Sequence, residues 1–225
     1  MCKRFSRIKL LSLSIFLLPV QLFSHPSPDF SPVEYAAENV KTIVFEKEDR
    51  MLAYPFIQPG PDDALILSFD VIDGEGGTLW YNIVHCDRDW NRSDLFTSDY
   101  LEGYEENQIT DFLPSFNTRV SYTHYRLSLP NDDIRLLVSG NYVITVWEPG
   151  NPDTPLLVRR FFISEGSSSA AVVFRRPMKP GATETHQQAE ITVSIGGLAV
   201  TDPYRQITLT IMQNGRSDRM RAGIT

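Results

Sequence analysis

Cysteine is scarce in this sequence: its 225 residues include only Cys2 and Cys86. The chain is therefore not a small domain held together by several disulfides, and its stability has to come from a buried apolar core. Basic residues are also in the minority, with 21 Lys and Arg against 28 Asp and Glu. Because neutralising phosphates needs Lys and Arg, this balance argues against a nucleic-acid partner.

Long apolar runs are missing as well, which argues against a polytopic membrane protein. The stretch Leu10–Leu18 follows four basic residues and is too short to span a bilayer. This pattern predicts a secretory signal peptide over residues 1–24. Cys2 lies before the apolar stretch, which argues against a lipoprotein. Cleavage would remove the four basic residues and no acidic ones, leaving 17 basic and 28 acidic residues, a formal charge of −11 and Cys86 as the single cysteine.

Strand signals recur along the chain after a Pro- and Ser-rich linker expected at residues 25–39. Alternating or β-branched runs separated by Gly and Pro turns predict strands at Val40–Phe45, Leu65–Val71, Thr78–Cys86, Val120–Leu129, Tyr142–Trp147 and Pro155–Ile163. The best helical candidate, Asp99–Glu106, is short. We therefore expect an all-β chain whose residues 40–165 form an Ig-like or fibronectin-like β-sandwich.

The stretch Glu165–Ala170 is rich in small polar residues and predicts a flexible joint. Three more strands are expected beyond it, at Ala171–Arg175, Ala189–Ile195 and Gln206–Met212. Three strands cannot close a sandwich, which needs about seven. Residues 170–225 thus read as the start of a second, incomplete β domain, as in a fragment of a longer protein.

Tyr142 stands at the start of a predicted strand, directly after the tight turn that contains Gly140. This arrangement is typical of a tyrosine corner, in which the hydroxyl bonds back to upstream backbone. A plain turn followed by a half-buried tyrosine is the alternative.

The densest cluster of polar groups is the run His-Cys-Asp-Arg-Asp-Trp at residues 85–90. Successive strand residues face opposite sides, so His85 and Cys86 cannot easily share a metal ion. Asp87 and Asp89 offer too few oxygens for a calcium loop. We expect no metal and no cofactor: the carboxylates fix a turn, the tryptophan covers the core edge, and Cys86 is a small buried hydrophobe.

Recognisable catalytic motifs, such as a Gly-x-Ser-x-Gly elbow or a His-Glu-x-x-His helix, do not occur. His124 lies among aromatic residues and is more typical of a cross-strand residue than of a catalytic base. Nothing places two carboxylates at the separation of a glycosidase pair. Trp80, Trp90 and Trp147 could stack on sugars, although filling the core and its rim is the simpler interpretation.

Four short motifs along the chain point to a known family. Leu-Ser-Phe-Asp at 67–70, the run at 85–90, Asp-Tyr-Leu-Glu-Gly at 99–103 and Ser-Gly-Asn-Tyr at 139–142 occur in that order. The block resembles the first domain of the type IX secretion system plug proteins, over roughly residues 40–165. The motif residues, which we expect to hold the fold rather than to react, are Asp70, His85, Cys86, Asp87, Asp89, Trp90, Tyr100, Gly103, Ser115, Asn117, Tyr122, His124, Tyr125, Pro130, Gly140, Asn141, Tyr142, Arg160 and Phe161.

The resemblance implies a non-enzymatic periplasmic protein of Gram-negative bacteria, exported by the general pathway and associated with the inner face of the outer membrane. Family members close the periplasmic opening of a large outer-membrane β-barrel translocon while it carries no client. The implied partner is that barrel, with no nucleic acid, no small-molecule ligand and no direct insertion into lipid. The competing interpretation is a carbohydrate-binding β-sandwich of a secreted protein, which exposed coplanar aromatic rings would favour and buried tryptophans would oppose. A hydrolase that has lost its catalytic part is a third interpretation, and a pocket with two nearby carboxylates would favour it.

Overall fold

The computed structural model describes residues 33–58, 63–72, 76–177, 187–197, 199–213 and 216–222, with side chains up to residue 211. The predicted signal peptide, residues 1–24, lies outside the described residues, and so does the linker up to residue 32. Within the described part of the chain, no helix combines the length and the apolar character needed to cross a bilayer.

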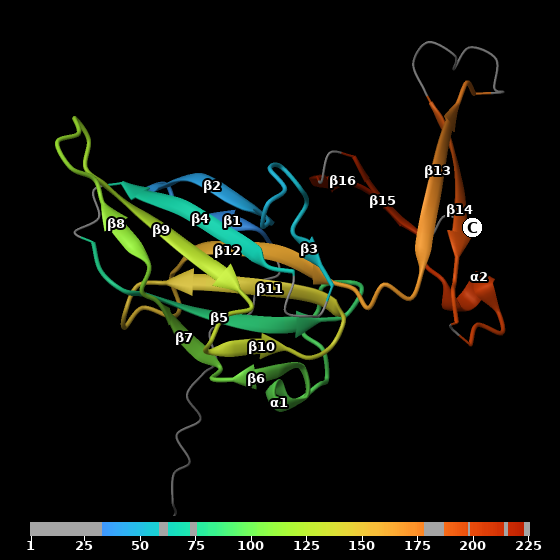
Figure 1. The fold of residues 1–225 in the computed structure, drawn as a ribbon, viewed down its shortest axis with the longest axis horizontal. Helices are drawn as coiled ribbons and strands as arrows, with labels where there is room; N and C mark the ends of the chain where they lie inside the picture. The colour runs from blue at the N-terminus through green and yellow to red at the C-terminus, as the bar shows by residue number, and fades with distance from the viewer. Residues whose placement is uncertain are drawn as a thin grey trace, which may run out of the picture.

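Two sheets form the predicted β-sandwich (Figure 1). The larger sheet has the order β1-β12-β11-β5-β7, with β3 beside β12 in parallel. Its strands are β1 (Tyr35–Ala36), β3 (Phe56–Ile57), β5 (Leu79–Cys86), β7 (Glu106–Ile109), β11 (Gly140–Trp147) and β12 (Pro155–Ile163). The smaller, antiparallel sheet has the order β2-β4-β9-β8 and consists of β2 (Val40–Lys47), β4 (Leu65–Ile72), β8 (Phe112–Pro114) and β9 (Tyr122–Leu129).

The core lies between these sheets and follows from the period of two along each strand. On β4, Leu65, Leu67 and Phe69 are fully buried, whereas the residues between them are half-buried. Phe45 of β2 packs edge-on against Phe161 of β12, with ring centroids 5.7 Å apart, so the two sheets meet through aromatic contacts. Each such fully buried side chain stabilises the fold by about 1.5–3 kcal/mol relative to exposure.

The six strands predicted for the sandwich are all present, with ends displaced by at most two residues. Several shorter strands were not predicted, because pieces of two to four residues carry no readable period. One of them, β1, pairs with β12, so Tyr35 and Ala36 of the expected linker belong to the large sheet.

The predicted helix Asp99–Glu106 is wrong beyond Tyr100. The observed helix α1 spans Thr97–Tyr100, and the chain then enters β6 (Leu101–Gly103), which pairs with β10 (Ile134–Leu136). Gly103 has φ +125°, a value that no helix contains. Leu101 is buried against the core, and this packing favours an extended backbone there.

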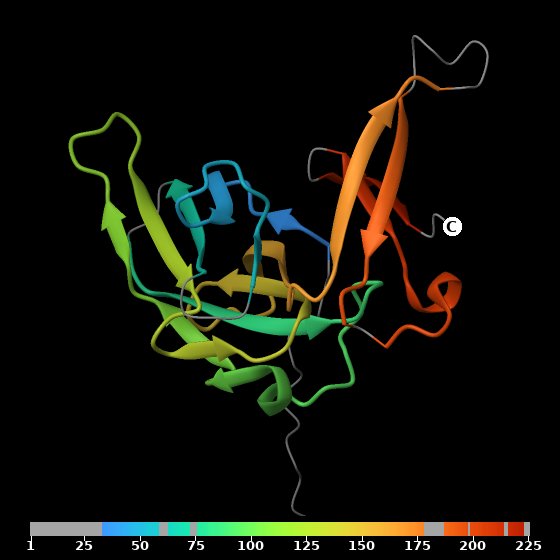
Figure 2. The ribbon, with the colours of Figure 1, turned by 45° about the vertical axis from the view of Figure 1, so that its right-hand side comes forward.

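Beyond the sandwich, the chain forms two hairpins. The first joins β13 (Ser169–Arg175) to β14 (Gln188–Ser194) and stands away from the sandwich (Figures 1 and 2). The second joins β15 (Thr210–Gln213) to β16 (Arg216–Ala222). The strand predicted at Gln206–Met212 begins four residues late, because Pro203 opens a short helix, α2 (Pro203–Gln206). A separate second domain from residue 170 stays a prediction.

Candidate functional site

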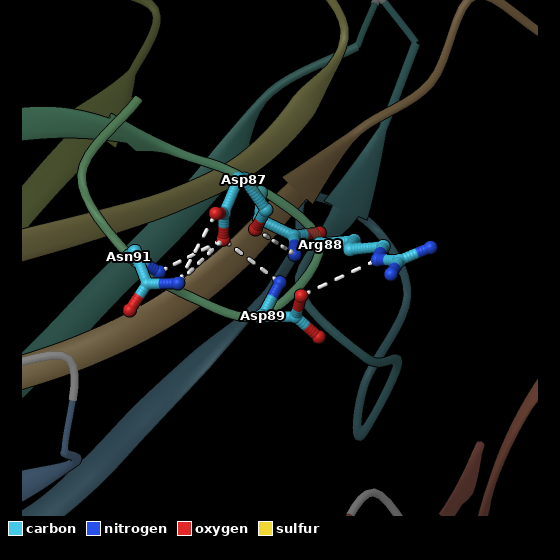
Figure 3. A network of polar contacts seen from close by, with 5 residues as sticks. Asp87, Arg88, Asp89 and Asn91 are labelled. Atoms are coloured by element: carbon cyan, nitrogen blue, oxygen red, sulfur yellow. Dashed lines mark hydrogen bonds and ion pairs between the residues drawn. The ribbon is translucent and has the colours of Figure 1, made fainter. Parts of the chain in front are cut away.

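The motif residues of the 85–90 run meet those of the Ser-Gly-Asn-Tyr run at one end of the large sheet, where β5 and β11 lie side by side. Asp87 organises the loop that follows β5. Its Oδ1 accepts hydrogen bonds from the backbone N–H groups of Asp89 (2.8 Å) and Asn91 (2.9 Å), and its Oδ2 accepts one from the Asn91 side chain (3.1 Å) (Figure 3). The side-chain bond from Asn91 is the main cause of the lowered pKa of Asp87. The carboxylate thus fixes a turn, as the sequence predicts.

This loop turns Trp90 back onto the outer face of the large sheet. Trp90 has φ +68°, a left-handed conformation that costs a non-glycine residue free energy. Its ring is 7% exposed and packs edge-on against Phe162 of β12, with centroids 5.2 Å apart. The Arg160 guanidinium lies 4.2 Å from the centroid of the same ring. Trp90 therefore seals a small second core on the far side of the sheet from the main one.

Cys86 belongs to this second core and is 2% exposed. Burial raises the pKa of its thiol to about 12. Because the thiolate is the nucleophile and the metal ligand, a thiol with so high a pKa is inert at neutral pH. The prediction that Cys86 is a small buried hydrophobe is confirmed.

His85 points to the opposite face of β5 from Cys86, toward the main core. Its Nε2 lies 3.3 Å from the Ser139 carbonyl oxygen, and its Nδ1 lies 2.8 Å from Ser93 Oγ. A carbonyl oxygen can only accept, so Nε2 carries a proton and donates to Ser139; in the neutral imidazole, Nδ1 then accepts from the Ser93 hydroxyl. The edge of Tyr142 covers the ring at 5.0 Å. Nε2 therefore holds β5 to the turn before β11, and Nδ1 holds it to the loop that follows β5.

Gly140 and Asn141 hold the same corner from the side of β11. Gly140 has φ +149°, and a Cβ there would lie 2.3 Å from His85 Nε2. No other residue fits without moving the imidazole. Asn141 Nδ2 donates to the Asp87 carbonyl oxygen at 2.9 Å, tying the two motif runs together.

Tyr142 forms the predicted tyrosine corner. Its hydroxyl donates to the Val138 carbonyl oxygen at 2.7 Å, four residues upstream. The residue is fully buried, its ring stacks on Phe161 at 5.2 Å, and burial raises its pKa. The alternative of a plain, half-buried tyrosine is wrong.

A cleft of about 450 Å³ opens beside Trp90 on the outer face of the sheet. It is lined by Glu34, Tyr54, Cys86, Arg88, Trp90, Gly140, Asn141, Arg160, Phe162, Thr208 and Thr210. The cleft walls combine aromatic rings with charges of both signs. No cluster of three or more potential metal ligands occurs among the described residues.

The remaining motif residues lie elsewhere. His124 Nδ1 donates to Asp70 Oδ1 at 2.7 Å across the register pair of β4 and β9. Next to this pair along β9, the Tyr125 hydroxyl donates to the Gly77 carbonyl oxygen at 2.9 Å, and its ring stacks on Phe69. These contacts connect strands and loops of the small sheet.

Tyr100 and Gly103 hold the β6 segment. Tyr100 is buried, and its hydroxyl lies 3.5 Å from the Ile83 carbonyl oxygen. A Cβ on Gly103 would lie 2.1 Å from the Asp133 carbonyl oxygen, so the β9–β10 turn can approach only a glycine. The peptide bond before Pro130 in that turn is cis.

Asn131, in the β9–β10 turn, was missed as a site residue by the sequence analysis. Its side chain donates to the Tyr81 hydroxyl (3.0 Å) and accepts from the N–H groups of Asp133 and Ile134. The sequence signal that could have identified it is its position directly after a proline in a predicted turn. The β8–β9 hairpin contains three further motif residues, Ser115, Asn117 and Tyr122. Asp89 forms an ion pair with Arg88 at the surface.

Burial argues against sugar stacking for two of the three tryptophans. Trp90 is 7% exposed and Trp147 is 3% exposed, while Trp80 is half-buried. Burial of Trp90 and Trp147 removes the ring faces that a sugar would need. Buried tryptophans oppose the carbohydrate-binding interpretation, and this holds for Trp90 and Trp147 but not for the half-buried Trp80.

Comparison with known proteins decides the family. Residues 40–165 match the family model described as the type 9 secretion system plug protein 1st domain. The chain belongs to this family. The match covers more than half of the 225 residues and confirms the resemblance inferred from the motifs. It associates the chain with type IX secretion and with a family of secretion components rather than of known enzymes.

Among solved structures, a hypothetical protein from Parabacteroides merdae is 28% identical to this chain, with a TM-score of 0.75. The match covers 84% of this chain and 48% of that one, so the chain spans about half the length of the relative. An alkylpurine DNA glycosylase, AlkC, of Pseudomonas fluorescens bound to abasic-site DNA is 14% identical over 56% of this chain and 30% of that one. Its TM-score of 0.29 is too low to support an argument. No curated protein matches the chain.

Proposed function

We propose that this chain is a non-enzymatic periplasmic component of the type IX secretion system that closes the periplasmic opening of the outer-membrane translocon barrel. The observation that carries the proposal is the family match over residues 40–165. Passage to the periplasm follows from the signal peptide predicted at residues 1–24.

The chemistry of the motif cluster supports a role that depends on shape rather than on reaction. Both ring nitrogens of His85 are hydrogen-bonded, the Asp87 carboxylate accepts hydrogen bonds within a turn, and burial keeps the Cys86 thiol protonated. Catalysis needs such groups poised toward a substrate, whereas these hold strands and loops together. A plug needs a rigid body with loops that can contact a pore wall, and a sandwich provides both.

The charge of the chain supports a protein partner. After loss of residues 1–24 the formal charge would be −11, because four of the 21 basic residues and none of the 28 acidic residues lie there. Such a chain is repelled by anionic lipid. Stable association with the outer membrane therefore requires a protein contact, and a standard-size interface buries about 800 Å² on each side.

Co-purification tests the proposal directly. The tagged full-length protein, expressed from its own locus, should be recovered with the translocon barrel in mild detergent. Deletion of the gene should make the outer membrane permeable to large solutes, and the wild-type gene supplied in trans should restore the barrier. Recovery only as a free protein, together with unchanged permeability on deletion, would refute the plug assignment.

A further inference from the structure

The β8–β9 hairpin extends beyond the body of the sandwich in both views of the fold (Figures 1 and 2). Its strands are β8 and β9, and residues 115–121 form the connection, which we term the hairpin tip. At its base, Phe112 packs on Tyr125 of the core, with ring centroids 5.7 Å apart. The hairpin therefore projects from the sandwich and is held at its base by packing against the core.

The hairpin carries three exposed apolar side chains within eight residues. Phe116 is 94% exposed, the highest value among the exposed large hydrophobic residues in the described part of the chain. Leu113 is 69% exposed and Val120 is 52% exposed. Single exposed apolar residues are ordinary, whereas exposed apolar residues that gather on one element favour an interaction site. A phenylalanine at its centre is the residue type that anchors protein interfaces.

Hydrogen bonds hold the hairpin tip in one conformation. The Ser115 N–H donates to the Tyr122 carbonyl oxygen at 2.7 Å, and Ser115 Oγ accepts from the Tyr122 N–H at 2.9 Å. The Thr118 hydroxyl donates to the Val120 carbonyl oxygen at 2.8 Å, and Asn117 takes the left-handed backbone conformation at φ +57°. A loop that is already ordered loses little entropy on binding. The motif residues Ser115 and Asn117 thus present Phe116 rather than contact a partner themselves.

The charges near the tip favour a protein partner over a lipid surface. Residues 115–121 contain one basic residue, Arg119, and no acidic residue, while the whole chain has a formal charge of −7. Binding to anionic lipid draws on clusters of basic residues, and a single short apolar element gives only marginal membrane affinity. The tip therefore fits a concave apolar pocket on a protein.

We propose that the hairpin tip docks into an apolar pocket at the periplasmic opening of the translocon barrel, with Phe116 as its anchor. This rests on the proposed plug function, which requires a contact with that barrel. The two flanking apolar side chains, Leu113 and Val120, exclude water around the anchor, as residues around an interface hot spot do.

The test compares three full-length tagged variants in cells that lack the wild-type protein: Phe116→Ser, Phe116→Trp and Met51→Ser. Met51 is 87% exposed on a different loop and is the matched control for loss of an exposed apolar side chain. Phe116→Ser should lower recovery of the barrel at least tenfold, Phe116→Trp should retain it, and Met51→Ser should behave as wild type. All three should melt at the wild-type temperature, because neither site is packed.

The outcomes separate the two proposals. If the wild-type protein does not recover the barrel, the plug function fails and the docking surface fails with it. If wild type and Phe116→Ser recover the barrel equally, the docking surface is refuted while the plug function stands. If Phe116 instead controls flotation of the purified protein with anionic lipid vesicles, the tip is a membrane contact and the proposal is overturned.

Discussion

Replacing Gly140 with alanine tests whether the His85 corner holds the large sheet together. A Cβ at Gly140 would lie 2.3 Å from His85 Nε2 and 3.1–3.2 Å from two ring carbons. Ordinary van der Waals contact begins near 3.4 Å, so the ring must move by about 1 Å. Ser93 and Ser139 hydrogen-bond to the imidazole, and the ring packs against Tyr142, so the shift disturbs all three contacts.

The expected magnitude has two parts. An alanine at this positive φ is strained by about 1–3 kcal/mol wherever it occurs. The two imidazole hydrogen bonds contribute about 0.5–1.5 kcal/mol each, and displacement of His85 weakens both. Gly77 separates the two parts, because its φ is +155° and its added Cβ would meet nothing within 4 Å. We therefore expect Gly140→Ala to lower the free energy of unfolding by about 1–3 kcal/mol more than Gly77→Ala.

Urea unfolding of the two variants, followed by tryptophan fluorescence, measures this difference. A double-mutant cycle provides the control: in a His85→Ala background, Gly140→Ala and Gly77→Ala should destabilise the protein equally, since the ring is gone. Equal destabilisation of the two variants in the wild-type background would refute the role assigned to His85.

Three further predictions concern the same cluster. Tyr142→Phe should lower the free energy of unfolding by about 0.5–1.5 kcal/mol, because the Val138 carbonyl oxygen loses its hydrogen-bond donor. Tyr104→Phe, at an exposed tyrosine, should leave the free energy of unfolding unchanged. Native Cys86 should resist a disulfide reagent at pH 8 and react only on unfolding. The raised pKa of its thiol contributes stability that is fully present below the ordinary value of 9.0. This contribution should be lost as the pH rises toward about 12. A single labelling rate in folded and unfolded protein would contradict the burial of Cys86. The lowered pKa of Asp87 contributes stability that is present above pH 3.8, its ordinary value, and is lost as the pH falls through the folded-state pKa. In an NMR titration, Asn91→Ala should raise the pKa of Asp87, because the side-chain hydrogen bond is lost. An unchanged pKa would refute the assigned bond.

The long strands could be read from the sequence because each is a local pattern. Leu65, Leu67 and Phe69 alternate with half-buried residues, and a period of two with one buried face specifies a strand wherever it occurs. The turn-forming role of Asp87 was readable for the same reason, since its partners Asp89 and Asn91 are close in the chain. The burial of Cys86 was predicted from its residue type, although the residues that cover it include Val143 and Val158 from distant strands. The family was readable from the order of its motifs.

The short strands and the site could not be read in this way. Tyr35 and Ala36 carry no period and pair with β12 only because the folded sheet has a free edge there. The helix predicted from Asp99 fails at Leu101 because burial against the core overrides local propensity.

The sequence by itself determined the sandwich and the resemblance to the family, and it predicts a targeting signal at residues 1–24. Only the tertiary structure decided which of those residues meet. His85 and Ser139 are 54 residues apart in the chain, yet they share a hydrogen bond because β5 and β11 pair. Phe116 carries no signal in the sequence, and its 94% exposure follows from the projection of the hairpin. Alternation specifies which face of a strand is buried, whereas strand neighbours and exposed tips depend on how the strands pair into sheets, which no local pattern encodes.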